Sequence, residues 1–137
     1  MVKITGEYQG DLHCVARHEP SGVVLTTDAP KDNQGRGEAF SPTDLVATAL
    51  VTCVATTMAM AGRRQGIELN GAKFEVTKEM SAVGPRRIAR LVTHVWLPFA
   101  KTDAVARTLE HAANNCPVHL SLCPSVEKPI ALHWAGE

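Results

Sequence analysis

The longest apolar segment of the sequence lies between residues 41 and 66. No charged residue occurs in it between Asp44 and Arg63, so a helix formed here has no polar face and has to be enclosed. Membrane-spanning helices need about 20 strongly apolar residues, whereas this segment is shorter and rich in alanine and threonine. We therefore predict a buried central helix over residues 41–66 and no contact with a membrane.

Both ends of this helix carry recognisable signals. Ser41 suits the N-cap, Pro42 suits the first helical position, and Asp44 stands where the acid of a capping box reaches back. At the other end, the positive charge of Arg63 favours a helix C-terminus, and Gly66 can adopt the left-handed conformation that ends a helix.

Three short segments of alternating or β-branched residues precede the helix and are separated by turn signals. They are residues 2–9, 12–18 and 23–27. We predict a three-stranded meander over residues 1–30, in which Cys14 faces the interior. A polar, glycine-rich loop over residues 31–38 then leads to the helix.

Two alternating segments and an amphipathic one follow the helix. The predicted elements are strands 73–80 and 88–97, a helix at 103–114 capped by Thr102, a short helical turn from Cys116 to Leu122, and a final edge strand at 129–134. The C-terminal part, residues 72–137, therefore contains a strand pair, helices and a last strand. Because strands and helices are grouped, we predict an α+β fold with antiparallel sheets and a single domain over residues 1–137.

The central helix raises a problem of coverage. A helix that is apolar on all sides needs cover on all sides, and six short strands from one chain are not enough to wrap it. A dimer that encloses two such helices provides the cover. We therefore expect a homodimer.

Composition and charge narrow the class of protein. The 14 basic and 14 acidic residues cancel, so no net field attracts nucleic acid or an anionic membrane. The first residues, MVKITGEYQG, contain no apolar run behind the lysine, which indicates no secretory signal and predicts a cytoplasmic protein. The four cysteines are then expected to start reduced, and to be packed, metal-bound or redox-active.

Two of the cysteines stand in distinctive contexts. Cys116 directly precedes a helix-starting proline, where free N–H groups favour a thiolate, so we expect its pKa to be lowered. Cys53 lies beyond the first turn of its helix and needs a cation or donor from elsewhere, or else it is a packed small residue. His119 follows Cys116 by one helical turn, so it can tune that thiol or lie on the surface.

Other histidines and cysteines raise the question of a metal site. The candidates are His13, Cys14, His18, His119 and Cys123. They follow no zinc-ligand spacing, and the glycines around Arg36 lack the strand-to-helix context of a phosphate-binding loop. We therefore predict neither a metal nor another cofactor.

Two motifs together resemble the OsmC/Ohr superfamily. One is GRGEAFSPTDLVATALVTC, with the spacing SP-x-x-L-x-x-x-A-x-x-x-C, and the other is NNCPVHLSL. The resemblance spans nearly the whole chain and agrees with the predicted order of strands and helices. It implies an intertwined homodimer with the long helices packed centrally and the sites at the subunit interface.

The resemblance also implies an activity, the thiol-dependent reduction of organic or fatty-acyl hydroperoxides. Cys53 attacks the peroxide and becomes a sulfenic acid, and Cys116 condenses with it to form a disulfide. An external dithiol reductant then restores both thiols. An apolar pocket for the alkyl part of the peroxide is expected near Leu50, Met58 and Met60.

One position departs from the family pattern. Members with peroxidase character carry a glutamate directly after the helix-start proline, set against an arginine from the N-terminal strands, but here Thr43 occupies the glutamate position. The possible substitutes for the acid are Asp44 and Glu38, and those for the arginine are Arg17 and Arg36. This departure motivates a second hypothesis, that of a non-catalytic OsmC-like protein that binds a small hydrophobic ligand at the dimer interface.

Overall fold

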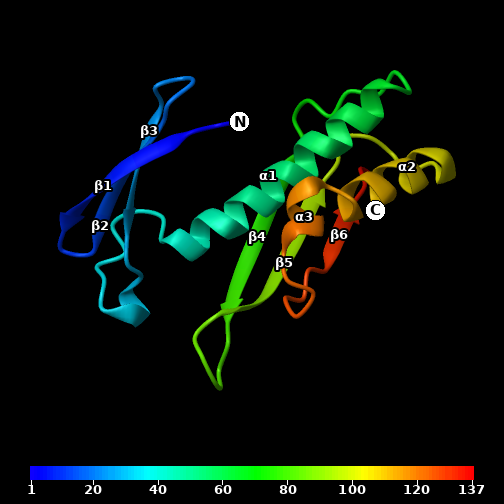
Figure 1. Ribbon diagram of the computed structural model, residues 1–137. Coiled ribbons are helices and arrows are strands. Elements are labelled where there is room, and N and C mark those ends of the chain that lie inside the picture. Colours follow the sequence, from blue (N-terminus) through cyan, green and yellow to red (C-terminus); the bar gives the residue numbers. More distant parts are fainter. The chain divides into compact units, whose positions relative to one another are not determined.

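A computed structural model describes residues 1–137 and shows the α+β fold predicted from the sequence (Figure 1). The chain divides into two compact units, Met1–Val46 and Ala47–Glu137, with the boundary inside the long helix. The elements are β1 (Ile4–Gly10), β2 (His13–His18), β3 (Val24–Asp28), the 3-10 helix η1 (Lys31–Asn33), α1 (Pro42–Arg63), β4 (Lys73–Met80), β5 (Ile88–Trp96), α2 (Asp103–Asn114), α3 (Pro117–Ser121) and β6 (Ile130–His133). The single domain remains a prediction.

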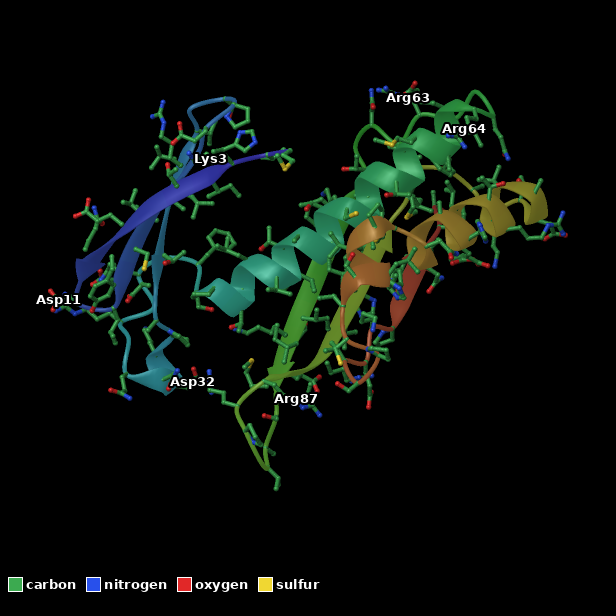
Figure 2. The ribbon with its side chains drawn as sticks, viewed as in Figure 1. Lys3, Asp11, Asp32, Arg63, Arg64 and Arg87 are labelled. Carbon is green, nitrogen blue, oxygen red and sulfur yellow. The ribbon has the colours of Figure 1, made fainter.

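The first unit contains the predicted three-stranded meander. β2 pairs antiparallel with β1 and with β3. The β1–β2 turn, marked by Asp11 in Figure 2, is tight because Gly10, Asp11 and Leu12 have φ angles of 88°, 49° and 61°. The prediction that Cys14 faces the interior is wrong, because Cys14 is exposed to solvent. Besides this sheet the unit has only η1, a loop and the start of α1, so it has no helical layer to bury the sheet.

The second unit contains a sheet in which β5 is the central strand. β4 and β5 form the predicted antiparallel pair, and β6 is the predicted edge strand. However, β6 runs parallel to β5, with Thr93 opposite Ile130 and Trp96 opposite His133. The prediction of antiparallel sheets is therefore corrected here. The reason is that α2 and α3 form a crossover connection. It returns the chain to the end of the sheet at which β5 starts, so that β6 runs in the same direction as β5.

The core of the second unit forms where α1, α2 and β5 meet. Leu91 and Val95, on one face of β5, are completely buried and pack with Leu50 and Met58 of α1 and with Leu109 of α2. This face of β5 is the one that the alternation of the sequence predicts to be apolar.

The ends of α1 follow the predicted capping signals. The Ser41 N–H donates to Asp44 Oδ2 at 2.9 Å, and the Asp44 N–H donates to Ser41 Oγ at 3.1 Å, so the two residues form a reciprocal capping box. At the other end Gly66 has a φ of 73°, and Figure 2 labels Arg63, the last residue of the helix, and Arg64, which follows it.

Burial of α1 on all sides is not present within one chain. The buried positions are Ala47, Leu50, Val51, Val54, Met58 and Gly62. The exposed positions Ala49, Thr52, Thr56 and Met60 follow a helical spacing and form one face, here called the outer stripe of α1. By length and composition α1 is apolar enough to cross a membrane, a test that core helices of soluble proteins also pass.

Candidate active site

The first predicted site residue, Cys53, lies in the middle of α1. Cys53 is partly buried and packs against the core of the second unit. Its Sγ lies 3.9 Å from the hydroxyl oxygen of Thr57, one turn further along the helix. Cys53 is therefore partly accessible to solvent, and one side of it packs against the core of the second unit.

The second predicted site residue, Cys116, is the N-cap of α3 and is completely buried. Its Sγ accepts a hydrogen bond from the His119 N–H at 3.4 Å, and Pro117 starts the helix. The expectation of a lowered pKa is wrong. Burial raises the pKa of the Cys116 thiol, and the opposing effect of the His119 N–H does not outweigh it.

The structure brings these two cysteines together. The side chain of Cys53 lies near enough to Cys116 to raise the pKa of the Cys116 thiol further, after the larger effect of burial. A residue in the middle of α1 and the N-cap residue of α3 are thus brought near each other. Both residues belong to the second unit, so this proximity is internal to one compact body.

The imidazole of His119 is engaged elsewhere. Burial lowers the pKa of His119 and the charge of Lys128 acts in the same direction, while the backbone of Lys128 has a smaller, opposite effect. The contact of His119 with Cys116 is made by its backbone N–H. The predicted tuning of Cys116 therefore comes from the backbone of residue 119.

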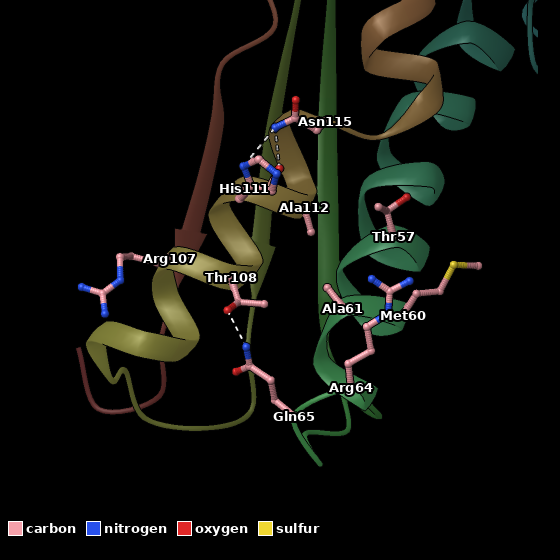
Figure 3. A pocket seen from close by; sticks show the side chains of 10 residues that line it. All are labelled: Thr57, Met60, Ala61, Arg64, Gln65, Arg107, Thr108, His111, Ala112 and Asn115. Carbon is pink, nitrogen blue, oxygen red and sulfur yellow. Dashed lines mark hydrogen bonds between the residues drawn. The ribbon is translucent and has the colours of Figure 1, made fainter.

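The predicted pocket residues divide into two sets. Leu50 and Met58 are completely buried in the core of the second unit, and their place in a pocket remains a prediction. Met60, which is 60% exposed, lines a groove of about 650 Å³ between α1 and α2 (Figure 3). The lining residues are Thr57, Met60, Ala61, Arg64, Gln65, Arg107, Thr108, His111, Ala112 and Asn115.

This groove combines apolar and cationic groups. In Figure 3, Thr57, Met60 and Ala61 come from α1, and Arg64 directly follows the end of that helix. A hydrogen bond of 2.7 Å from Gln65 Nε2 to Thr108 Oγ1 connects its two walls. The polar lining was not predicted from the sequence, although the amphipathic pattern of α2 indicates that such residues lie on its solvent side.

The predicted activating residues all lie in the first unit. Arg17 Nε is 3.8 Å from Glu19 Oε1, and Arg36 Nη1 is 3.7 Å from Glu38 Oε1. Asp44 accepts the Ser41 N–H in the capping box. Each of these charged groups therefore has a partner within its own unit, and their role in activating Cys53 remains a prediction.

A further cluster in the first unit was not predicted. His13 Nε2 lies 3.2 Å from Glu38 Oε2 and 3.6 Å from Asp28 Oδ1. The hydrogen bond with the Asp11 carbonyl and the two carboxylates raise the pKa of His13. The N–H groups of Glu38 and Arg36, together with His13, lower the pKa of Asp28. The cluster could have been found from the predicted meander, because an antiparallel pairing of β2 with β3 in this register places His13 opposite Asp28.

The two remaining cysteines are exposed. Cys14 lies opposite Tyr8 and Thr27 in the meander. The hydroxyl of Ser125, whose oxygen is 3.1 Å from Cys123 Sγ, lowers the pKa of the Cys123 thiol. Cys123, exposed and with a lowered pKa, is thus a rival to Cys53 for reactions with thiol reagents.

Comparison with known proteins places this geometry in context. The family model described as OsmC-like protein matches residues 35–128. No curated protein sequence matches the chain. A structure from Psychrobacter arcticus 273-4, provisionally named an osmotic stress induced and detoxification response protein, is 38% identical with a TM-score of 0.91, over 97% of this chain and 96% of that one.

More distant structures share the fold. An organic hydroperoxide resistance protein from Legionella pneumophila is 13% identical with a TM-score of 0.79, over 97% of this chain and 96% of that one. One from Bacillus subtilis is 18% identical with a TM-score of 0.74, over 96% of this chain and 97% of that one.

Proposed function

The chain belongs to the OsmC-like protein family, and on that premise we propose that it is a thiol-dependent reductase of organic hydroperoxides. The observation that carries the proposal is that Cys53 of α1 packs against the same core in which Cys116, the N-cap residue of α3, is buried, near enough to raise the pKa of Cys116. It pairs a partly exposed thiol with a buried one, which suits a nucleophile and a resolving thiol.

The proposed reaction has three steps. The Cys53 thiolate attacks the terminal peroxide oxygen, the O–O bond breaks, and the alkoxide leaves and takes up a proton to become an alcohol. The resulting sulfenic acid is attacked by the Cys116 sulfur, so that the S–S bond forms and water leaves. An external dithiol then reduces the disulfide and is itself oxidised.

We also propose that the protein is a homodimer that covers the outer stripe of α1. Apolar helix faces are rarely left in water, and the N-terminal meander adds exposed Ile4, Val24 and Leu25. The names of the related structures do not state an oligomer. Light scattering of the purified protein should give about twice the mass of one chain, 14.7 kDa. A single-chain mass at micromolar concentration would contradict the dimer.

A peroxide assay tests the activity. Purified protein is mixed with cumene hydroperoxide and dithiothreitol, and the loss of peroxide is followed over time. The rate of wild type should exceed that of Cys53→Ser by at least on the order of 10³-fold, since the variant lacks the nucleophile. The matched control is Cys123→Ser, which removes an exposed thiol with a lowered pKa and should retain the wild-type rate.

Two outcomes count against the proposal. Equal rates of peroxide loss for wild type and Cys53→Ser would contradict the proposed activity. A loss of rate in Cys123→Ser alone would show that Cys123, and not Cys53, is the nucleophile. The second candidate function, binding of a small hydrophobic ligand without catalysis, is supported by the groove beside Met60. It predicts no turnover, together with a retained ligand in native mass spectrometry.

A further inference from the structure

Three metal-ligating side chains of the first unit converge on one point. His13 comes from β2, Asp28 ends β3, and Glu38 lies on the loop that leads to α1. One donor atom from each residue lies within 4.8 Å of the other two. The three steps proposed for the peroxide reaction use Cys53, Cys116 and an external dithiol, and none of them requires a metal ion at this cluster.

The separations of these donors suit a shared cation. Ligand bonds of about 2.1 Å around one ion place neighbouring donors roughly 3.0–3.4 Å apart in octahedral or tetrahedral geometry. The Nε2 atom of His13 is 3.2 Å from Glu38 Oε2 and 3.6 Å from Asp28 Oδ1. Shifts of a few tenths of an ångström would therefore place all three donors around one ion.

The imidazole is held in the orientation that a metal ligand needs. His13 Nδ1 lies 2.7 Å from the Asp11 carbonyl oxygen, so this nitrogen carries the proton and donates it. The lone pair of the neutral ring then sits on Nε2, the atom that faces the two carboxylates. Metal-binding histidines are commonly oriented by such a bond from the other ring nitrogen.

Asp28 provides the second, independent observation. Its side chain is completely buried, and its Oδ2 accepts the N–H groups of Arg36 at 3.2 Å and Glu38 at 3.0 Å. Its Oδ1, which faces His13, is buried without a hydrogen-bond partner. A buried carboxylate oxygen without a hydrogen-bond partner costs free energy of folding, and a bound ion would offset this cost.

We propose that His13, Asp28 and Glu38 bind a divalent transition-metal ion. One imidazole and two carboxylates suit borderline ions such as Zn²⁺ and Mn²⁺, whereas Ca²⁺ requires six to eight oxygen ligands. The Glu38 side chain is 53% exposed, so an ion and its remaining water ligands can enter from solvent. The bound ion joins β2, the end of β3 and the loop before α1.

Manganese binding tests this site in the intact protein. Mn²⁺ is titrated into metal-free wild type, and the loss of the free-ion signal is followed by electron paramagnetic resonance. Mn²⁺ is suitable because it prefers oxygen and nitrogen donors to the thiols of this chain. One ion should bind per chain, and Zn²⁺ should displace it, since Zn²⁺ binds such donors more tightly.

Matched variants assign the bound ion to the cluster. Glu38→Gln removes one ligand from a largely exposed position and should weaken Mn²⁺ binding at least about tenfold. Glu19→Gln removes a carboxylate of the same unit that pairs with Arg17 and should bind as wild type does. Added Mn²⁺ should raise the melting temperature of wild type and Glu19→Gln more than that of Glu38→Gln.

The outcomes separate this site from the peroxide chemistry, because none of the readouts uses turnover. Absence of stoichiometric binding to wild type would overturn the proposal and leave the cluster as a hydrogen-bonded ion pair. Unchanged affinity in folded Glu38→Gln, verified by circular dichroism, would place the ion elsewhere and overturn it as well.

Discussion

Cys116→Ser is expected to react with peroxide once and then to accumulate as the sulfenic acid of Cys53. In wild type Cys116 lies near Cys53, so on the proposed mechanism its sulfur attacks the sulfenic acid soon after it forms. The serine hydroxyl cannot form a disulfide, so the oxidised state persists. After one equivalent of cumene hydroperoxide, peptide mass spectrometry should find a Cys53–Cys116 cross-link in wild type and a dimedone adduct on Cys53 in the variant.

The pH dependence of the cross-linking step provides a second measurement. Because burial raises the pKa of Cys116, only a small part of this thiol is ionised at neutral pH. Cross-linking in wild type should therefore become faster as the pH rises through the alkaline range, towards a plateau above the usual thiol pKa. Cys123→Ser serves as the control and should form the same cross-link. A cross-link that involves Cys123 instead, or a rate that falls with rising pH, would refute the resolving role of Cys116.

Leu50→Ala is expected to lower the free energy of unfolding by about 2–5 kcal/mol, the usual cost of a cavity in a packed core. The sequence suggested Leu50 as a pocket residue, but its side chain is completely buried and packs with residues of β5 and α2. Its loss should therefore reduce stability, and any effect on peroxide affinity should be secondary. Urea unfolding at a fixed protein concentration measures the change.

A leucine on the surface provides the matched control. Leu120 of α3 is 67% exposed, so Leu120→Ala removes the same atoms with a cost within about 0.5 kcal/mol. If both variants lost the same stability, the assignment of Leu50 to the core would fail.

The local features of the fold could be predicted because neighbouring residues determine them. The capping box of Ser41 and Asp44 and the N-cap role of Thr102 depend on positions three residues apart. The turns that separate the strands also depend on local residues. The direction of β6 depends on how α2 and α3 return the chain to the sheet. The residues of the strand itself do not indicate this direction.

The three predicted pocket residues lie on different faces of α1. Positions 58 and 60 of a helix point about 200° apart, so Met58 and Met60 cannot line the same cavity. Leu50 and Met58 share the buried face, whereas Met60 belongs to the outer stripe. The helical spacing alone separates these positions, although the segment carries no charged residue between Asp44 and Arg63 to mark one face as polar.

The site chemistry was harder to predict because it depends on burial and on distant residues. The position of Cys116 before a proline favours a thiolate, but complete burial has the larger, opposite effect. His13, Asp28 and Glu38 are brought together by the pairing of β2 with β3 and by the loop that follows. Neither effect is visible in the residues next to each side chain.

The unequal burial of Cys53 and Cys116 has a consequence for the reductant. A disulfide between them would expose only the Cys53 side to solvent, because Cys116 is completely buried and Cys53 is partly exposed. An incoming thiolate has to approach the sulfur that it attacks, so the mixed disulfide would form on Cys53 and Cys116 would leave first. The shape of the protein surface, rather than the acidity of the leaving thiol, would then determine the direction of attack.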